Sequence, residues 1–266
     1  MNKLNIIRAA TLAAGVAGVL ALTVPASASP HTTAARPARG GSLTGRVGAL
    51  PPTSTDHAIG RIPTPANSRY FAGYQAVVKA GSATVSAASF TVPALSCATA
   101  TRAIGPVAGV DANNFKTFSS AFLYTGCVNG QAVNFPSLVL NGNETDYTTT
   151  PLSAGDVINL TTKVSTNRTR VQVTDVTTGV TEKLLGPGAS ASDAYFGDSA
   201  WFDNGALLHV PDFGKLTFKN CLVDGQALAN WRPYAIQRVN SLGKVQIATG
   251  GMWPGGTAFS THFQHS

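Results

Sequence analysis

The chain has 266 residues and a formal net charge of +7, and only 12% of its residues are charged. Its 27 glycines, together with frequent Thr, Ser and Val, disfavour helices and favour strands joined by tight turns. Residues 1–66 hold six Lys or Arg against one Asp, whereas residues 67–266 hold thirteen against eleven acidic residues. The folded part is therefore nearly neutral and lacks a basic stripe, which argues against nucleic-acid binding.

The first segment of the chain has the features of an export signal. Lys3 and Arg8 form a basic start, and the stretch from Ala9 to Val24 is apolar and uncharged. Small residues at Ala26 and Ala28 then form an A-x-A cleavage site, so residues 1–28 are predicted to be a signal peptide. The alternative is an uncleaved anchor, but the apolar run is short for a membrane span. We expect an extracellular protein that is free of the membrane after cleavage.

Residues 29–66 form a basic, proline-rich stretch without hydrophobic periodicity. Such a composition does not bury enough apolar surface to fold by itself. We interpret it as a disordered tail or linker, or as a pro-segment with a regulatory role, and the sequence leaves both readings open.

The remaining residues, 67–266, are predicted to form a single all-β domain. Short runs of apolar and β-branched residues alternate with turn dipeptides such as Asn129-Gly130 and Asn141-Gly142. The predicted strands are 70–78, 83–92, 103–110, 119–124, 136–140, 157–165, 170–175, 181–185, 194–202, 214–219, 235–240 and 259–263. This pattern is typical of an antiparallel sandwich or barrel, and nothing in it predicts an oligomer. We expect a monomer.

Three cysteines and five histidines bear on the site chemistry. An oxidising compartment permits a disulfide, and Cys97–Cys127 is the preferred pair because both residues are predicted to lie in loops that flank one strand pair. Cys221 would then be a free, buried thiol. No Cys or His spacing fits a metal site, so neither a metal nor another cofactor is expected.

The segment Gly197-Asp198-Ser199 has a superficial likeness to the nucleophile region of trypsin-like serine peptidases. Serine catalysis requires a histidine base and an orienting acid beside the serine. No upstream histidine lies in a predicted core strand, because His57 belongs to the proline-rich stretch. A serine nucleophile at this position is therefore not favoured.

The domain as a whole resembles the glutamic peptidases, or eqolisins, which are secreted acid endopeptidases with a two-sheet antiparallel β-sandwich. The matching segments follow one another in the family's order. They are Phe71–Tyr74 for W-x-G-Y, Phe90–Pro93 for W-T-V-P, Val107–Asp111 for W-V-G-I-D, Thr178–Gly179 for T-T-G, Ala194–Asp198 for the end of A-E-W-I-V-E, Pro211–Phe218 for A-D-F-G-x-V-T-F and Gly256–Phe263 for G-x-x-F-x-V-x-W. The resemblance implies the fold class: an all-β, two-sheet antiparallel sandwich.

The resemblance also implies a groove in which a Glu activates water and a Gln stabilises the oxyanion. The Gln position corresponds to Tyr124 and the Glu position to Asp198. Val139 replaces a second glutamate and Val107 replaces a tryptophan, whereas Asp111 is retained. The only glutamates, Glu144 and Glu182, are predicted to lie at turns and not in the groove.

These replacements predict a protein that binds an extended polypeptide or glycan in its groove without cutting it. Two alternatives remain open. One is an acid endopeptidase in which Asp198 acts as general base, although Asp is one methylene shorter than Glu. The other is a lectin-like module that uses Trp201, Trp231 or Trp253.

Overall fold

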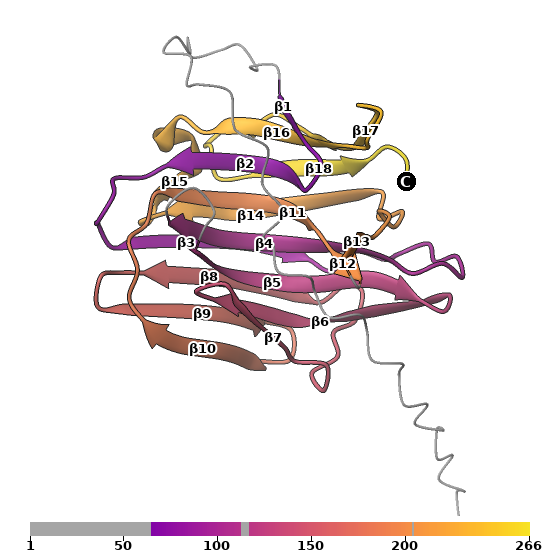
Figure 1. Ribbon diagram of the computed structural model, residues 1–266, viewed down its shortest axis with the longest axis horizontal. Coiled ribbons are helices and arrows are strands. Elements are labelled where there is room, and N and C mark those ends of the chain that lie inside the picture. Colours follow the sequence, from indigo (N-terminus) through magenta and orange to yellow (C-terminus); the bar gives the residue numbers. More distant parts are fainter. Residues whose placement is uncertain (1–64, 113–116, 204) are drawn as a thin grey trace, which may run out of the picture. The chain divides into compact units, whose positions relative to one another are not determined.

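The structure is a computed structural model that describes residues 65–112, 117–203 and 205–266. The predicted signal peptide and nearly all of the proline-rich stretch lie outside the described residues. Within them the chain is almost entirely β (Figure 1). No helix in this described part is long and apolar enough to span a bilayer.

The strands form two antiparallel sheets that share one connecting strand. Sheet A has the order β7-β6-β5-β4-β11-β2-β16-β17-β18 and sheet B the order β10-β9-β8-β3-β14. The strands of sheet A are β7 (Asn143–Asp146), β6 (Gln131–Leu140), β5 (Thr117–Val128), β4 (Arg102–Ala112), β11 (Asp193–Ala200), β2 (Phe71–Val77), β16 (Tyr234–Val239), β17 (Val245–Thr249) and β18 (Phe259–Phe263). Those of sheet B are β10 (Thr181–Pro187), β9 (Arg168–Asp175), β8 (Val157–Val164), β3 (Thr84–Thr91) and β14 (Lys215–Val223).

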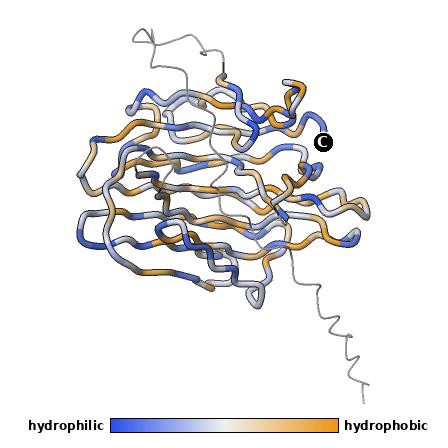
Figure 2. The backbone as a smooth tube through the Cα atoms, viewed as in Figure 1, coloured by the Kyte–Doolittle hydropathy of each residue, from blue (hydrophilic) through white to orange (hydrophobic). Residues whose placement is uncertain are grey.

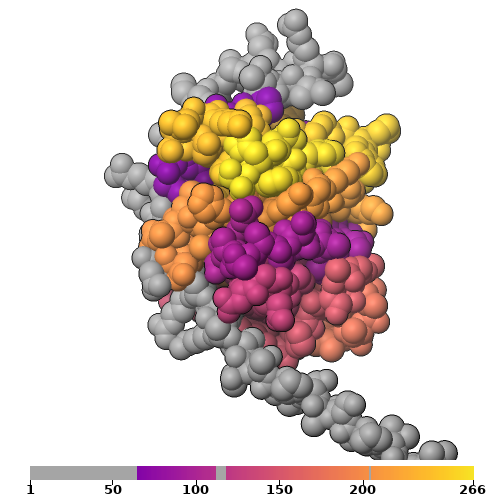
Figure 3. Space-filling view, turned by 90° about the vertical axis from the view of Figure 1, so that its right-hand side faces the viewer, coloured from indigo at the N-terminus to yellow at the C-terminus, as the bar shows by residue number. Residues whose placement is uncertain are grey.

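Short elements complete the fold. Strand β1 (Ala66–Ser68) pairs in parallel with β16, and β15 (Gln226–Ala227) pairs with β14. Strands β12 (Phe202–Asp203) and β13 (Ala206–Leu207) form a separate hairpin, and a 3-10 turn spans Leu228–Trp231. Strand β14 joins the two sheets, because its first half pairs with β18 and its second half with β3. In the space-filling view of Figure 3, the strands near the C-terminus lie at the top and those from the middle of the chain lie at the bottom.

Alternation of apolar and polar residues decides which side of each strand faces the core. In β8 and β9 every second residue is buried, and apolar and polar colours alternate along the strands (Figure 2). Strands β4, β5 and β6 of sheet A lie across β8 and β9 of sheet B. The expected two-sheet sandwich is thus confirmed. We call the side of each sheet that faces the other sheet its inner face, and the opposite side its outer face.

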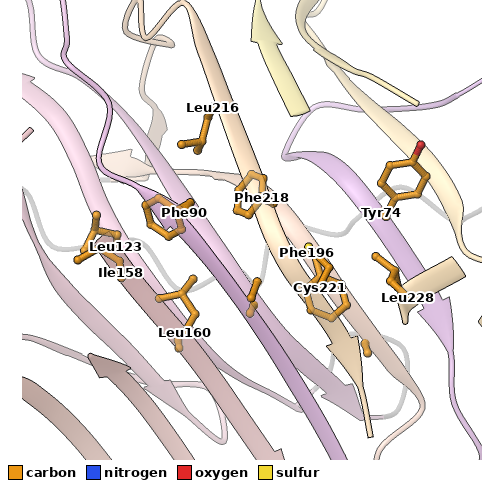
Figure 4. Packing of buried hydrophobic residues seen from close by; sticks show 14 of the residues in the cluster. Tyr74, Phe90, Leu123, Ile158, Leu160, Phe196, Leu216, Phe218, Cys221 and Leu228 are labelled. Carbon is orange, nitrogen blue, oxygen red and sulfur yellow. The ribbon is translucent and has the colours of Figure 1, made fainter. Parts of the chain in front are cut away.

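The core between the inner faces is built from aromatic and branched side chains (Figure 4). The Phe218 and Phe259 rings stack with centroids 5.0 Å apart, and Phe90 lies 5.7 Å from Phe218. A buried threonine also ties the sheets together, because Thr162 Oγ1 donates to the Ala108 carbonyl at 2.8 Å and accepts from the Ala121 amide at 3.0 Å.

Cys97 and Cys127 form a disulfide, and Cys221 is a buried free thiol in β14. The placement of the pair differs from the expectation, since only Cys97 lies in a loop. Cys127 is the penultimate residue of β5, which continues well beyond the predicted end at Tyr124. The structure also contains strands that the sequence did not predict, among them β7 and β17. Strand β7 was missed because Asn141-Gly142 was taken as the start of a longer turn.

Candidate functional site

The outer face of sheet A collects four of the five expected groove residues. Along β4, β5 and β6, residues of the inner core alternate with residues that point to the opposite side of the sheet. The latter include Val107, Asp111, Tyr124 and Val139. The apolar and aromatic members of this face form two clusters. One holds Phe71, Val107, Phe118, Phe122, Val139, Tyr195 and Ile236, and the other holds Ala103, Tyr124, Phe135 and Trp201. These side chains are almost wholly buried.

Tyr124 has no exposed surface. Its ring stacks on Phe135 with a centroid distance of 4.7 Å and meets the edge of Trp201 at 5.0 Å. Its hydroxyl has no hydrogen-bond partner among the described residues. Burial, reinforced by Asp203 and Asp146, raises the pKa of Tyr124 to about 12. Tyr124 is thus a neutral aromatic side chain that fills its place on the face and has no basic character.

Asp198 does not join these residues. Its strand partner is Ala72, which belongs to the inner core, so its side chain lies on the inner face of sheet A. The carboxylate is fully buried and accepts a hydrogen bond from Thr261 Oγ1 at 2.5 Å. Burial raises the pKa of Asp198 to about 7, although the Thr261 bond and the nearby Arg238 guanidinium favour its charged form. The expected meeting of Asp198 with Tyr124 and Asp111 in one groove does not occur.

Ser199, the next residue along β11, occupies the outer face instead. Its strand partners are Phe71, a member of the outer cluster, and Gly105 of β4. A Cβ atom on Gly105 would lie 3.2 Å from Phe122 and 3.3 Å from Trp201, both side chains of that face. Strand β4 separates Ser199 from Tyr124 on β5, and Gly105 leaves no side chain between them. Ser199 and Tyr124 thus lie at the same level of the outer face, on either side of Gly105.

Two glycines bring β2 and β11 unusually close in the middle of sheet A. Gly73 and Gly197 are strand partners with φ of 148° and 153°. A Cβ atom on Gly73 would lie 2.0 Å from the Phe196 carbonyl oxygen, and one on Gly197 would lie 2.0 Å from that of Ala72. Only glycine fits at either position. The pair leaves a stretch of bare backbone beside Val107 on the outer face.

Carboxylates of the outer face lie at one end of β4 and β11. Asp111 has no exposed surface, and its strand partner on β11 is Asp193. The Tyr195 and Ser120 hydroxyls are hydrogen-bonded to each other. Burial raises the pKa of Tyr195, and Asp111 adds to the rise. Asp193 and Asp111 likewise add to the burial that raises the pKa of Tyr234. These phenol groups are therefore uncharged.

A second pair of carboxylates lies on β7, where the sequence had predicted none. Glu144 is the strand partner of Val139, and Asp146 that of Ser137. Glu144 therefore faces the same side as Val139 and is not confined to a turn, contrary to expectation. Its Oε1 accepts a hydrogen bond from Ser137 Oγ at 2.9 Å. Burial, followed by the charge of Asp146, raises the pKa of Glu144 to about 8.

No group of three or more His, Cys, Asp and Glu residues among the described residues is arranged to hold a metal ion. The outer face of sheet A carries hydroxyls, phenols and carboxyl groups.

The sequence model of the Peptidase A4 family matches residues 69–248, which is more than half of the chain and includes sheet B and most of sheet A. The protein belongs to the Peptidase A4 family. No curated protein sequence is similar enough to this family member to count as a relative.

Solved structures of eqolisins share the fold of this A4 member. Scytalido-glutamic peptidase with a transition-state analog inhibitor superposes with a TM-score of 0.60 at 15% identity, over 74% of this chain and 98% of its own. SCP-B, an eqolisin in complex with the tripeptide Ala-Ile-His, superposes with a TM-score of 0.57 at 17% identity. The superposition covers 73% of this chain and 100% of SCP-B. Aspergilloglutamic peptidase from Aspergillus niger superposes with a TM-score of 0.53 at 17% identity. The superposition covers 61% of this chain and 99% of that peptidase.

In this A4 member, sequence reasoning missed Ser199 and Glu144. The six letters of A-E-W-I-V-E, counted from Ala194, end at Ser199, and this count could have found it. Glu144 had a weaker signal: Asn143–Asp146 is too short and polar to read as a strand, and only pairing with β6 reveals it.

Proposed function

We propose that this A4 member binds an extended polypeptide along the outer face of sheet A and does not hydrolyse it. One observation carries the proposal: where the family dyad is expected, the outer face presents Tyr124 and Ser199. Attack on an amide requires a base that activates water. The Tyr124 phenol, with a pKa of about 12, cannot supply one at acid pH, and Asp198 lies on the other face.

The choice of polypeptide as ligand rests on relatives and on side-chain chemistry. Scytalido-glutamic peptidase has been solved with a peptide-based transition-state analog, and SCP-B with a tripeptide. The outer face combines aromatic side chains with buried hydrogen-bonding groups, which suits peptide side chains and backbone. Trp201 gives the glycan alternative no support on this face, because it is buried and packed against Tyr124. Trp253 is 43% exposed, but it lies beside Lys215 of β14.

A second candidate function is weak acid hydrolysis by the β7 carboxyl groups. Glu144, with a pKa of about 8, keeps its proton in acid, and Asp146 lies two residues along the same strand. In this candidate the protonated Glu144 serves as general acid and Asp146 as general base. This candidate replaces hydrolysis by Asp198, whose side chain faces the core.

A cleavage assay separates the two candidates. Pure protein would be incubated with a proteome-derived peptide library from pH 2 to 7, and the products identified by mass spectrometry. We expect no cleavage by the wild type or by Ser199→Ala. Cleavage that Glu144→Gln abolishes and Asp198→Asn retains would establish the second candidate. Cleavage that only Asp198→Asn abolishes would contradict both.

A gain-of-function variant tests the assignment of the two positions. The double change Tyr124→Gln and Ser199→Glu restores the residue types of the family dyad on the outer face. We expect acid cleavage to appear in this variant and not in the control Tyr124→Gln with Asp198→Glu. Equal gain in both would mean that the outer-face position is misassigned.

Binding is tested by hydrogen–deuterium exchange with and without the same peptides. We expect added protection in β4, β5 and β11, and little change in β8 to β10. Absence of protection at saturating peptide would count against a polypeptide ligand.

We also propose that the protein is exported, on the strength of residues 1–28. N-terminal sequencing of protein from the culture medium is expected to begin at Ser29, or further on if the stretch 29–66 is a removed pro-segment. Recovery of the full-length chain in the membrane fraction would contradict export.

A further inference from the structure

The outer face of sheet B is basic, although the folded part of the chain is nearly neutral overall and its sequence contains no basic stripe. Four exposed cations alternate with core residues along its strands. They are Lys163 of β8, Arg168 and Arg170 of β9, and Lys183 of β10. Lys219 of β14 joins them through its pairing with Ser89. Four of the five cations come from the consecutive strands β8, β9 and β10, and the fifth comes from β14, which the folded sheet brings to the same surface.

None of the described carboxylates lies among these cations. Glu182 is a neighbour of Lys183 but is the strand partner of the core residue Val173, so it points away and accepts a hydrogen bond from Thr150 at 2.7 Å. Asp224 lies at the edge, in the turn after β14, where its Oδ1 accepts from the Val85 amide at 2.6 Å. The positive charge of this face therefore has no neutralising partner within it.

The cations also lie close to one another. Lys163 and Arg170 are direct strand partners, and Arg168 lies two residues from Arg170 on the same side of β9. Like charges that are directly opposite on neighbouring strands destabilise a sheet. An anionic ligand that lies across the strands would relieve this repulsion.

Hydroxyl and amide groups form an ordered row beside the cations. The Arg170 guanidinium donates to Gln172 Oε1, Gln172 Nε2 donates to Thr174 Oγ1 at 2.9 Å, and the Thr174 and Thr181 hydroxyls are 3.1 Å apart. Thr161 lies beside Gln172 as its strand partner on β8. This chain fixes the direction of the guanidinium and presents groups that exchange hydrogen bonds with sugar hydroxyls.

We propose that this face, made of Lys163, Arg168, Arg170, Lys183, Lys219 and the hydroxyl row, binds an acidic polysaccharide. Guanidinium and ammonium groups pair with carboxylates along the polymer, and the Thr and Gln side chains bind its hydroxyls. Strands β8, β9 and β10 contain no aromatic residue on which nucleic-acid bases could stack. The described part of this face offers little apolar surface for a membrane, since Leu185 and Val157 are the exposed large hydrophobic residues of β8, β9 and β10.

The test is binding of the full chain to polygalacturonate, with neutral dextran, duplex DNA and anionic phospholipid vesicles as comparison ligands. The test variant is Lys163→Gln, Arg170→Gln and Lys183→Gln. The matched control, Arg69→Gln, Lys79→Gln and Lys244→Gln, removes the same number and type of exposed charges elsewhere. Calorimetry at low and physiological salt would measure the dissociation constants.

We expect the wild type and the control to bind polygalacturonate and not dextran, and the test variant to bind at least about tenfold more weakly at low salt. Equal losses in the two variants would overturn the proposal, because net charge alone would then explain binding. Tighter binding to DNA or vesicles than to polygalacturonate would also overturn it. These outcomes do not depend on the groove of sheet A.

Discussion

The two outer faces of the sandwich differ in composition although the same alternation of residues creates them. On sheet A the outward residues are aromatic, branched or glycine, with carboxyl groups at the rim, and they are buried. On sheet B they are cations, threonines and amides, and they are exposed. Packing of one sheet on the other uses only the inner residues of each, so the two outer faces are free to differ in composition. Four tests follow from this difference.

The largest effect is expected from filling the close approach in sheet A. Gly73→Ala places a methyl group 2.0 Å from the Phe196 carbonyl oxygen, which β2 and β11 cannot accommodate in their present pairing. We expect a loss of at least about 4 kcal/mol in the free energy of unfolding, measured by urea denaturation. The control Gly81→Ala, in a turn with φ of 79° and open space, should lose only about 1 kcal/mol. Equal losses would contradict the close-packing argument.

The second effect concerns the aromatic packing that distinguishes sheet A from sheet B. Tyr124→Ala removes a fully buried ring stacked on Phe135 and should cost about 3–5 kcal/mol in thermal or chemical unfolding. Tyr124→Phe keeps the ring and removes a hydroxyl that has no partner among the described residues, so its cost should stay below about 1 kcal/mol. A Phe variant as unstable as the Ala variant would show that the hydroxyl is bonded.

The third effect is a dependence of stability on pH that arises in sheet A. Asp198 and Glu144 have pKa values raised from 3.8 to about 7 and from 4.5 to about 8. The folded state thus binds protons more tightly than the unfolded state, so stability is greatest below about pH 4 and declines as the pH rises through 7 and 8. Urea denaturation at pH 4, 6 and 8 should show a loss of roughly 2–4 kcal/mol.

Asp198→Asn isolates the contribution of the inner-face carboxyl group to this dependence. The amide keeps an acceptor for Thr261 but does not titrate, so the decline between pH 4 and 7 should become shallower. An unchanged slope would assign the dependence to other groups.

The smallest effect is expected on sheet B. Lys163→Gln removes one of two directly opposed cations and should stabilise the fold by a few tenths of a kcal/mol at low salt. The gain should vanish at high salt, where surface charges are screened. Lys79→Gln, at an exposed position after β2, should change stability in neither condition. Destabilisation by Lys163→Gln would mean that its neighbours do not repel it.

Much of the fold followed from local sequence signals. Val/Thr-rich runs and Asn-Gly turns predicted most of the strands, and the order of motifs from Phe71–Tyr74 to Gly256–Phe263 identified the family that the match over residues 69–248 shows. The Cys97–Cys127 pair was also preferred on sequence grounds, although Cys127 lies inside a strand. These features depend on residues that are close in the chain or on motif order, which a single sequence contains.

The arrangement of the site was decided only by tertiary structure. Successive residues of a strand point to opposite faces of the sheet. Matching the family's glutamate to Asp198 instead of Ser199 is an error of one residue, and it moves the predicted site residue from the outer face to the core. Glu144 reaches the outer face because β7 pairs with β6, and Lys219 of β14 joins the cations of β8, β9 and β10 because β3 links the two parts of sheet B. The sequence determined which side chains are present and which segments form strands. Pairing and register, which depend on long-range packing, determined which of those side chains meet.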